Sequence, residues 1–386
     1  MGLTFLLKPL VDMIYQLQIL DIILMLICLY GFFSPRYQPV YEKIDYLVML
    51  LMLLFFCSFL RNINGLSQFL KIESSFMLYF LGRFYQIDYE QVMQCIRIGF
   101  LPVLLFTLFS FITGLGFIEW GSINTFRGFY YFKTDLALAM SQCFIVYSFC
   151  RNTIKYHWII LLLCLYFILI ANARIYYVIS AFTLFLLVCY WHEIRTGKTL
   201  RISSKFAVYS FLIGLIVLVA MVSLNDIWGD EYLLLDDSDG LYTGANTQGR
   251  TIAWAEIYQI FNNSNLITRF IGIDLCSDIS PSIDINSHNN YLKVLFSIGY
   301  IGSIIYIAFI VTIFRFICKT KDREMFYVSL SLFATYIIGG LSYITIESTQ
   351  GTWIVMFIIG IIVSTMKKRE LATNEIVLPD SNKSLV

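Results

Sequence analysis

Long apolar runs recur along almost the whole chain, separated by short polar connections. They lie at about 15–33, 44–60, 99–118, 134–150, 156–173, 175–191, 206–225, 297–316, 326–343 and 353–366, with a weaker run near 73–86 that Arg83 interrupts. A helix that crosses a bilayer needs about 20 apolar residues, and its backbone polar groups must be satisfied within the helix. The pattern predicts an all-α, polytopic membrane helix bundle with about 11 transmembrane helices, in the range 10–12. We expect residues 1–386 to form a single membrane domain.

Composition supports this prediction and excludes several classes of protein. Hydrophobic residues make up 59% of the 386 positions and charged residues 14%, whereas a soluble domain has about 45–50% and about 25%. The net charge of +1 gives no basic patch of the kind that a nucleic-acid-binding protein carries. The nine cysteines include no Cys-x-x-Cys pair, so neither a disulfide framework nor a zinc site is indicated. Near the amino end, Lys8 precedes no cleavage signal, which favours an uncleaved first anchor.

The basic residues predict the orientation of the bundle, because short loops rich in Lys and Arg remain in the cytoplasm. Such residues gather at 192–205, at 315–323 and at the start of the tail 367–386, which we expect to be a disordered cytoplasmic end. The same rule places residues 226–289 outside, as one long extracytoplasmic loop. That loop contains ten Asp or Glu but only two basic residues, Arg250 and Arg269.

The long loop contains one predicted helix and one acidic run. After Arg250, the side chains of Trp254, Ile257 and Phe261 share a face at helical spacing. The run 236–240, Asp-Asp-Ser-Asp-Gly, superficially matches a calcium loop, but Leu235 and Asn246 stand where such a loop needs its first and last carboxylates. The Asp-x-Asp within this run resembles the metal motif of nucleotide-sugar transferases, but nucleotide sugars are not supplied to an outer loop. The sequence therefore predicts no metal site.

Three arginines are expected on the outer side. Arg174 stands between two apolar runs with almost no loop, so it is either functional or a cation that extends to the interface from a tight helical hairpin. Arg127 lies in another outer connection. Arg250 begins the predicted helix, where free N–H groups and a guanidinium suit a diphosphate. Its alternative role is an ion pair with Glu256 or another carboxylate of the loop.

His288 is the most informative titratable residue. It belongs to the run Asn286-Ser287-His288-Asn289-Asn290, which leads directly into an apolar helix. The positive end of a helix dipole disfavours the imidazolium, so a neutral ring could act as a general base. The alternative is a capping or interfacial histidine.

Taken together, these residues resemble the O-antigen polymerase and O-antigen ligase superfamily of bacterial envelope proteins. The resemblance lies in Arg174, in Gly249-Arg250-Thr251 with Trp254, in Gly272, and in Ser287-His288-Asn289-x-Tyr291-Leu292 followed by Gly299 and Gly302. It is strongest over residues 249–302, and the helix pattern fits most of the chain.

The resemblance implies a metal-independent glycosyltransferase without cofactors, in the bacterial inner (plasma) membrane with an extracytoplasmic (periplasmic) active site. The donor would be an oligosaccharide on undecaprenyl diphosphate, transferred to the next lipid-linked repeat unit during O-antigen or capsule polymerisation. His288 would be the general base, and Arg250 and Arg174 would stabilise the charge that develops on the diphosphate. Arg127, Asn289 and Trp254 would bind substrate. A chain-length regulator and a flippase are the implied protein partners.

Two other functions remain open at this point. A ligase would use the same residues to pass finished polymer to a terminal acceptor. A lipid-linked oligosaccharide flippase or other transporter would place its charged residues near the middle of the membrane, whereas the sequence concentrates polar residues in the loop 226–289.

Overall fold

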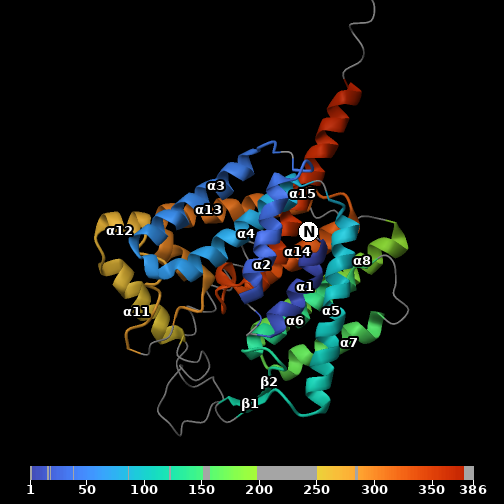
Figure 1. Cartoon of the computed structure of the whole chain (residues 1–386), viewed down its shortest axis with the longest axis horizontal. Helices are drawn as coiled ribbons and strands as arrows, with labels where there is room; N and C mark the ends of the chain where they lie inside the picture. Colours follow the sequence, from blue (N-terminus) through green and yellow to red (C-terminus); the bar gives the residue numbers. More distant parts are fainter. Residues whose placement is uncertain are drawn as a thin grey trace, which may run out of the picture.

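The computed structural model describes residues 2–14, 17, 19–37, 39–85, 87–120, 123–150, 157–197, 250–282 and 286–377. Helices dominate this part of the chain (Figure 1), with a single two-stranded hairpin among the described residues. The α-helices and strands are α1 (Gly2–Met13), α2 (Leu20–Tyr30), α3 (Lys43–Arg61), α4 (Leu66–Phe84), α5 (Tyr89–Ile112), β1 (Phe117–Trp120), β2 (Ile123–Phe126), α6 (Lys133–Ser148), α7 (His157–Ile170), α8 (Arg174–Thr196), α11 (Arg250–Asn263), α12 (Leu266–Ile271), α13 (Asn290–Lys319), α14 (Arg323–Gly339) and α15 (Thr349–Val377). Short 3-10 turns are η2 (Gly31–Phe33), η3 (Ile63–Gly65) and η6 (Thr345–Glu347).

Five of the described helices are long and apolar enough to cross a membrane. They are Lys43–Arg61, Tyr89–Ile112, Arg174–Thr196, Asn290–Lys319 and Thr349–Lys367. The apolar segments Leu20–Phe33 and His157–Ile170 are shorter, and the predicted span 206–225 lies outside the described residues. These helices support the prediction of an all-α membrane protein, but the expected number of 11 spans is not established.

Three segments differ from the sequence prediction. Helix α1 lies before the first predicted span, in a part of the chain where no helix is predicted. The predicted run 99–118 extends past the end of α5 into strand β1, in which Phe117 pairs with Phe126 of β2. The tail that we expected to be disordered after Arg369 is helical to Val377. Helix α1 is not predicted from the sequence because it is only 12 residues long and because Lys8 and Asp12 interrupt its apolar positions.

The centre of the bundle is the pair α4 and α15. The helices approach so closely at Gly82 and Gly360 that a Cβ on either residue would overlap backbone atoms of the other helix. Two polar contacts fix their register: the Trp353 indole N–H donates to Ser74 Oγ at 2.9 Å, and the Ser75 and Thr352 hydroxyls lie 2.6 Å apart. Side chains along the apolar part of α15 are almost all buried, so this helix forms the core.

One end of the bundle carries the basic residues that the sequence assigns to the cytoplasm. The Arg323 guanidinium at the start of α14 donates to the carbonyls of Glu193 and Gly197 at the end of α8. Near the carboxyl end of α15, Lys367 forms an ion pair with Glu42, which precedes α3. Since a helix of 17–23 residues is about 25–35 Å long, the opposite ends of α8, α14 and α15 lie far from these charges.

Candidate functional site

A cavity of about 570 Å³ lies beside the connection from α14 to α15, remote from the basic end. Its wall comes from four parts of the chain: the end of α1 together with one side of α2, the first two-thirds of α4, the start of α6 with the residues before it, and the turn η6 with the start of α15. The polar lining residues are Asp12, Asp21, Ser67, Lys71, Glu73, Ser74, Asp135, Glu347, Ser348, Thr349 and Gln350, the aromatic ones are Tyr131, Phe132, Tyr343 and Trp353, and the other apolar ones are Ile22, Met25, Leu26, Leu29, Leu70 and Met77.

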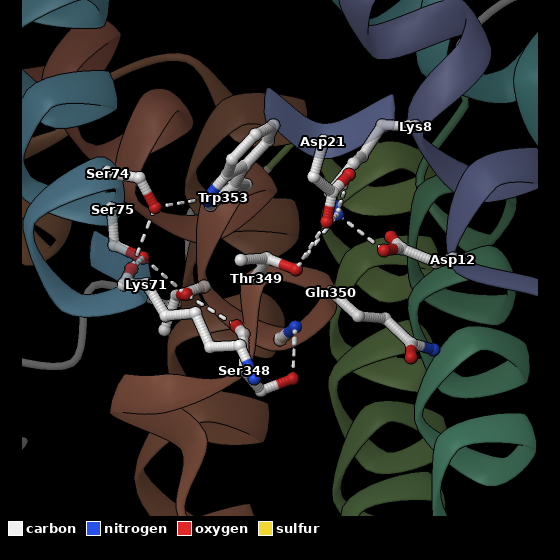
Figure 2. Close-up of polar contacts among 12 residues, drawn as sticks. Lys8, Asp12, Asp21, Lys71, Ser74, Ser75, Ser348, Thr349, Gln350 and Trp353 are labelled. Atoms are coloured by element: carbon white, nitrogen blue, oxygen red, sulfur yellow. Dashed lines mark hydrogen bonds and ion pairs between the residues drawn. The ribbon is translucent and has the colours of Figure 1, made fainter. Parts of the chain in front are cut away.

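Lys8 holds one wall of this cavity in place, as Figure 2 shows. Its ammonium is buried, donates to Asp12, lies 2.9 Å from both oxygens of Asp21, and donates to Thr349 Oγ1 at 3.0 Å. The Thr349 hydroxyl in turn donates to Asp21 at 2.9 Å. Buried charges persist when they are paired and hydrogen-bonded, so this network ties α1, α2 and α15 together.

The opposite wall is fixed by hydroxyl and indole groups. The Ser74 and Ser75 hydroxyls both donate to the Lys71 carbonyl, at 2.8 and 3.1 Å. The indole of Trp353 donates to Ser74, and the Lys8 ammonium lies 4.5 Å from the centre of the Trp353 ring. The orientation of the Trp353 ring is therefore determined from both walls.

Glu73 is the exception among these satisfied groups. Its side chain lines the cavity and is 9% exposed, and its Oε1 has no hydrogen-bond partner among the described residues. A buried carboxyl group without a partner is costly. Ionisable groups of this kind within a membrane protein are functional-site candidates by default.

A second buried cluster joins the cavity to the segment around His288. The Lys293 ammonium lies 2.7 Å from Glu347 Oε1, which lines the cavity, and 2.7 Å from Asp278 Oδ1. Asp278 accepts a hydrogen bond from the Ser287 hydroxyl at 2.9 Å. Burial, the largest effect, raises the pKa of Glu347 above its ordinary value, while the Lys293 charge opposes this rise.

Three of the predicted site residues meet at the start of α13. The Trp254 indole donates to the carbonyl of Ser287, and Asn289 caps α13 by accepting from the N–H groups of Tyr291 and Leu292 at 2.9 and 3.1 Å. His288, between them, is half-buried and has a φ of 42°. Few residues other than glycine adopt a positive φ, and such conformations cluster at functional sites. Asn289 therefore has a structural role as the cap of α13. The positive φ of His288 is compatible with a functional role for that residue.

The glycines named in the resemblance create a break in α13. Gly299 interrupts the helix with a φ of 67°, and a Cβ there would overlap the backbone of Phe270 and Gly272. The Arg61 guanidinium binds the carbonyls that surround the break, at 3.0 Å from Ile271, 2.6 Å from Gly272 and 2.9 Å from Ser297. Broken helices are tolerated within membranes where other groups satisfy the freed carbonyls, and Arg61 does so here.

The three predicted arginines do not line the cavity where their side chains are described. Arg127 donates to the carbonyl of Tyr131 at 2.9 Å, which fixes the turn that brings Tyr131 to the cavity. Arg174 is exposed at the first residue of α8. The predicted helix after Arg250 is present as α11, but the side chain of Arg250 and the preceding loop 226–249 lie outside the described residues.

The residues that form the cavity were not predicted from the sequence, although part of the signal is present there. Asp21 and Asp135 fall inside predicted apolar runs, and Glu73 inside the weaker one, so the rule that drew attention to Arg174 applies to these carboxyl groups too. Lys8, Lys293 and Glu347 could not be paired from sequence, because their partners lie on other elements.

Within the described residues, no group of three His, Cys, Asp or Glu side chains is arranged to hold a metal ion. In the comparisons with known proteins, no family model and no curated protein matches the chain.

Proposed function

We propose that this protein is a bacterial polysaccharide polymerase that transfers a growing glycan from undecaprenyl diphosphate to the next lipid-linked repeat unit. One observation carries the proposal: a cavity of about 570 Å³ in an apolar helical protein, lined by carboxyl, hydroxyl, amide and aromatic groups and joined through Glu347, Lys293 and Asp278 to the His288 segment. Convergent polar groups among aromatic side chains are typical of a site for a small organic ligand.

The proposed reaction is a substitution at the anomeric carbon of the donor. An acceptor hydroxyl attacks that carbon, the bond from the carbon to the diphosphate oxygen breaks, and undecaprenyl diphosphate leaves with the electron pair. The hydroxyl proton passes to the imidazole of His288, which acts as general base. Diphosphate is a good leaving group, so the mechanism needs no general acid.

The arginines have a separate part in this proposal. Negative charge grows on the diphosphate as the bond breaks, and fixed guanidinium groups in surroundings of low dielectric stabilise such charge. Arg174 and Arg250 take this role, with the diphosphate outside the carboxyl-rich cavity. The contact of Arg127 with Tyr131 supports a positioning role for Arg127 instead.

The test is the polymer made by cells that carry His288→Ala in place of the native protein. We expect loss of long chains and retention of single repeat units on the final acceptor. His157→Ala is the matched control, because His157 begins α7 and has no part in the proposed reaction. A full ladder of chain lengths from His288→Ala would refute the proposal. Full-length chains that accumulate on the lipid carrier would indicate a ligase.

A second candidate function, transport of a lipid-linked oligosaccharide, is favoured by two specific observations. Polar groups are not concentrated in the outer loop alone: Lys8, Asp12 and Asp21 form a buried charged network between helices, and α13 is broken at Gly299. Both features occur at the binding sites of transporters. In liposomes, movement of the lipid-linked unit across the bilayer without elongation would favour this alternative.

A further inference from the structure

The balance of charge in the cavity indicates what it can bind. Carboxyl groups of Asp12, Asp21, Glu73, Asp135 and Glu347 line it, whereas Lys71 is the one lining Lys or Arg among the described residues. The adjacent ammonium groups are already engaged, since Lys8 pairs with Asp12 and Asp21 and Lys293 with Asp278 and Glu347. An anionic ligand would meet more carboxyl groups than cations here.

The hydrogen-bond donors beside Glu73 are also engaged. Ser74 and Ser75, which follow it in α4, donate to the carbonyl of Lys71. The indole of Trp353 donates to Ser74, and Figure 2 shows that these groups point toward one another across α4 and α15. No described protein donor therefore reaches Glu73 Oε1. The missing donor is one that a ligand can supply.

The apolar part of the lining suits a ring-shaped ligand. Trp353, Tyr131, Phe132 and Tyr343 present aromatic surface to the same cavity, and the volume is within the range of sites for small organic ligands, about 300–1,000 Å³. A sugar ring combines hydroxyl donors with apolar C–H faces that pack on aromatic rings. A metal ion fits less well, because the described carboxyl groups do not form a ligand cluster.

We propose that this cavity is a saccharide subsite that binds an uncharged or amine-bearing sugar residue, with the Glu73 carboxyl group as its hydrogen-bond acceptor, and that it rejects anionic groups. The identification of the ligand as a sugar rests on the proposed function. Within that function the cavity holds the sugar portion of a lipid-linked substrate, and the diphosphate stays outside.

The test is ligand-observed NMR titration of the full-length protein in nanodiscs with three free sugars: glucosamine, N-acetylglucosamine and glucuronic acid. We expect saturation transfer to the first two and dissociation constants about tenfold or more lower than that of glucuronic acid, because the carboxylate of glucuronic acid would face the carboxyl groups that line the cavity. Equal binding of all three sugars, tighter binding of glucuronic acid, or binding of none would overturn the proposal.

Glu73→Leu provides the residue-level test, because it removes the acceptor oxygen. It should weaken glucosamine binding by about tenfold or more, whereas Glu90→Leu, at an exposed position near the start of α5, should leave it unchanged. Unchanged binding by Glu73→Leu would contradict the assignment. If this variant fails to fold, the native protein's discrimination among the three sugars still decides. The titration measures sugar binding and does not depend on glycosyl transfer. If the protein binds the sugars but makes no polymer, the saccharide subsite is supported and only the proposed polymerase reaction is refuted.

Discussion

Lys293 and Glu347 form a buried ion pair, with 2.7 Å between Nζ and Oε1, that joins the start of α13 to the turn η6 before α15. The same ammonium also lies 2.7 Å from Asp278, which accepts from the Ser287 hydroxyl beside His288. The cavity and the His288 segment therefore share one network of charges. Any rearrangement of the η6 turn that moves Glu347 would be transmitted to this segment.

Replacement of Lys293 by Met tests the importance of this network for stability. The variant would leave Asp278 and Glu347 buried without their cation, so we expect a loss of about 3–5 kcal/mol in the free energy of unfolding. Chemical unfolding in detergent measures it. Lys319→Met, at an exposed position at the other end of α13, is the control. Equal stability of the two variants would show that the ammonium is not needed to hold the carboxylates.

The break in α13 gives a second prediction. Gly299→Ala would force a Cβ against the backbone of Phe270 and Gly272 and place alanine at a positive φ. We expect a cost of about 1–3 kcal/mol from the backbone conformation alone, with more from the overlap. Gly339→Ala, where a Cβ would make only an ordinary contact with Thr345 at 3.5 Å, should be nearly neutral. Thermal unfolding of both variants measures the difference, and a neutral Gly299→Ala would contradict the described break.

The contact of Glu256 with Ser280 and Ser282 should depend on pH. Hydrogen bonds from Ser280 and Ser282 hold the pKa of its carboxyl group below the ordinary value. Because the pKa of Glu256 is lower in the folded protein than in the unfolded chain, where it is about 4.3, the ionised carboxylate stabilises its contact with Ser280 and Ser282 at any pH above the unfolded value. This stabilisation is lost as the pH falls through the lower pKa of the folded protein. The protection of the Ser282 amide, whose N–H donates to Glu256, should therefore fall at acidic pH, when the exchange rate is expressed relative to the intrinsic rate at each pH. Glu256→Gln should remove that pH dependence; an unchanged profile would refute the assignment.

Two arginines should respond differently to replacement. Arg174 is exposed, so Arg174→Ala should change stability by no more than about 0.5 kcal/mol but should lower the rate of chain elongation by about 100-fold if it stabilises the diphosphate. Arg127→Ala removes the hydrogen bond to the Tyr131 carbonyl and should lower the melting temperature. Melting curves and elongation assays on both variants separate the roles. Normal elongation by Arg174→Ala would remove it from the site.

The features that the sequence predicts well are those carried by long, uniform runs. Helix α3 matches the predicted run 44–60 within a residue at each end, because apolar positions fill residues 46–57 without interruption. The helical spacing of Trp254, Ile257 and Phe261 predicts helix α11, and Ile257 and Phe261 are indeed buried together with Phe296.

The cavity could not be predicted in the same way, because its walls come from elements far apart in the chain. Asp12 and Thr349 are brought together through Lys8, and nothing in the local pattern of either residue indicates that contact. Lys8 carries a charge near the amino end, yet it is buried because three oxygen-bearing side chains surround it. The pairing of charges across helices, rather than the charge of any segment, decides which ionisable residues lie inside.

The most direct test of the central claim is chain elongation by the purified protein in liposomes that contain lipid-linked repeat units. The native protein should lengthen the glycan and release undecaprenyl diphosphate, and His288→Ala should do so about 100- to 10,000-fold more slowly, the usual effect of a lost general base. Elongation by His288→Ala at the native rate, or no elongation by the native protein, would contradict the account.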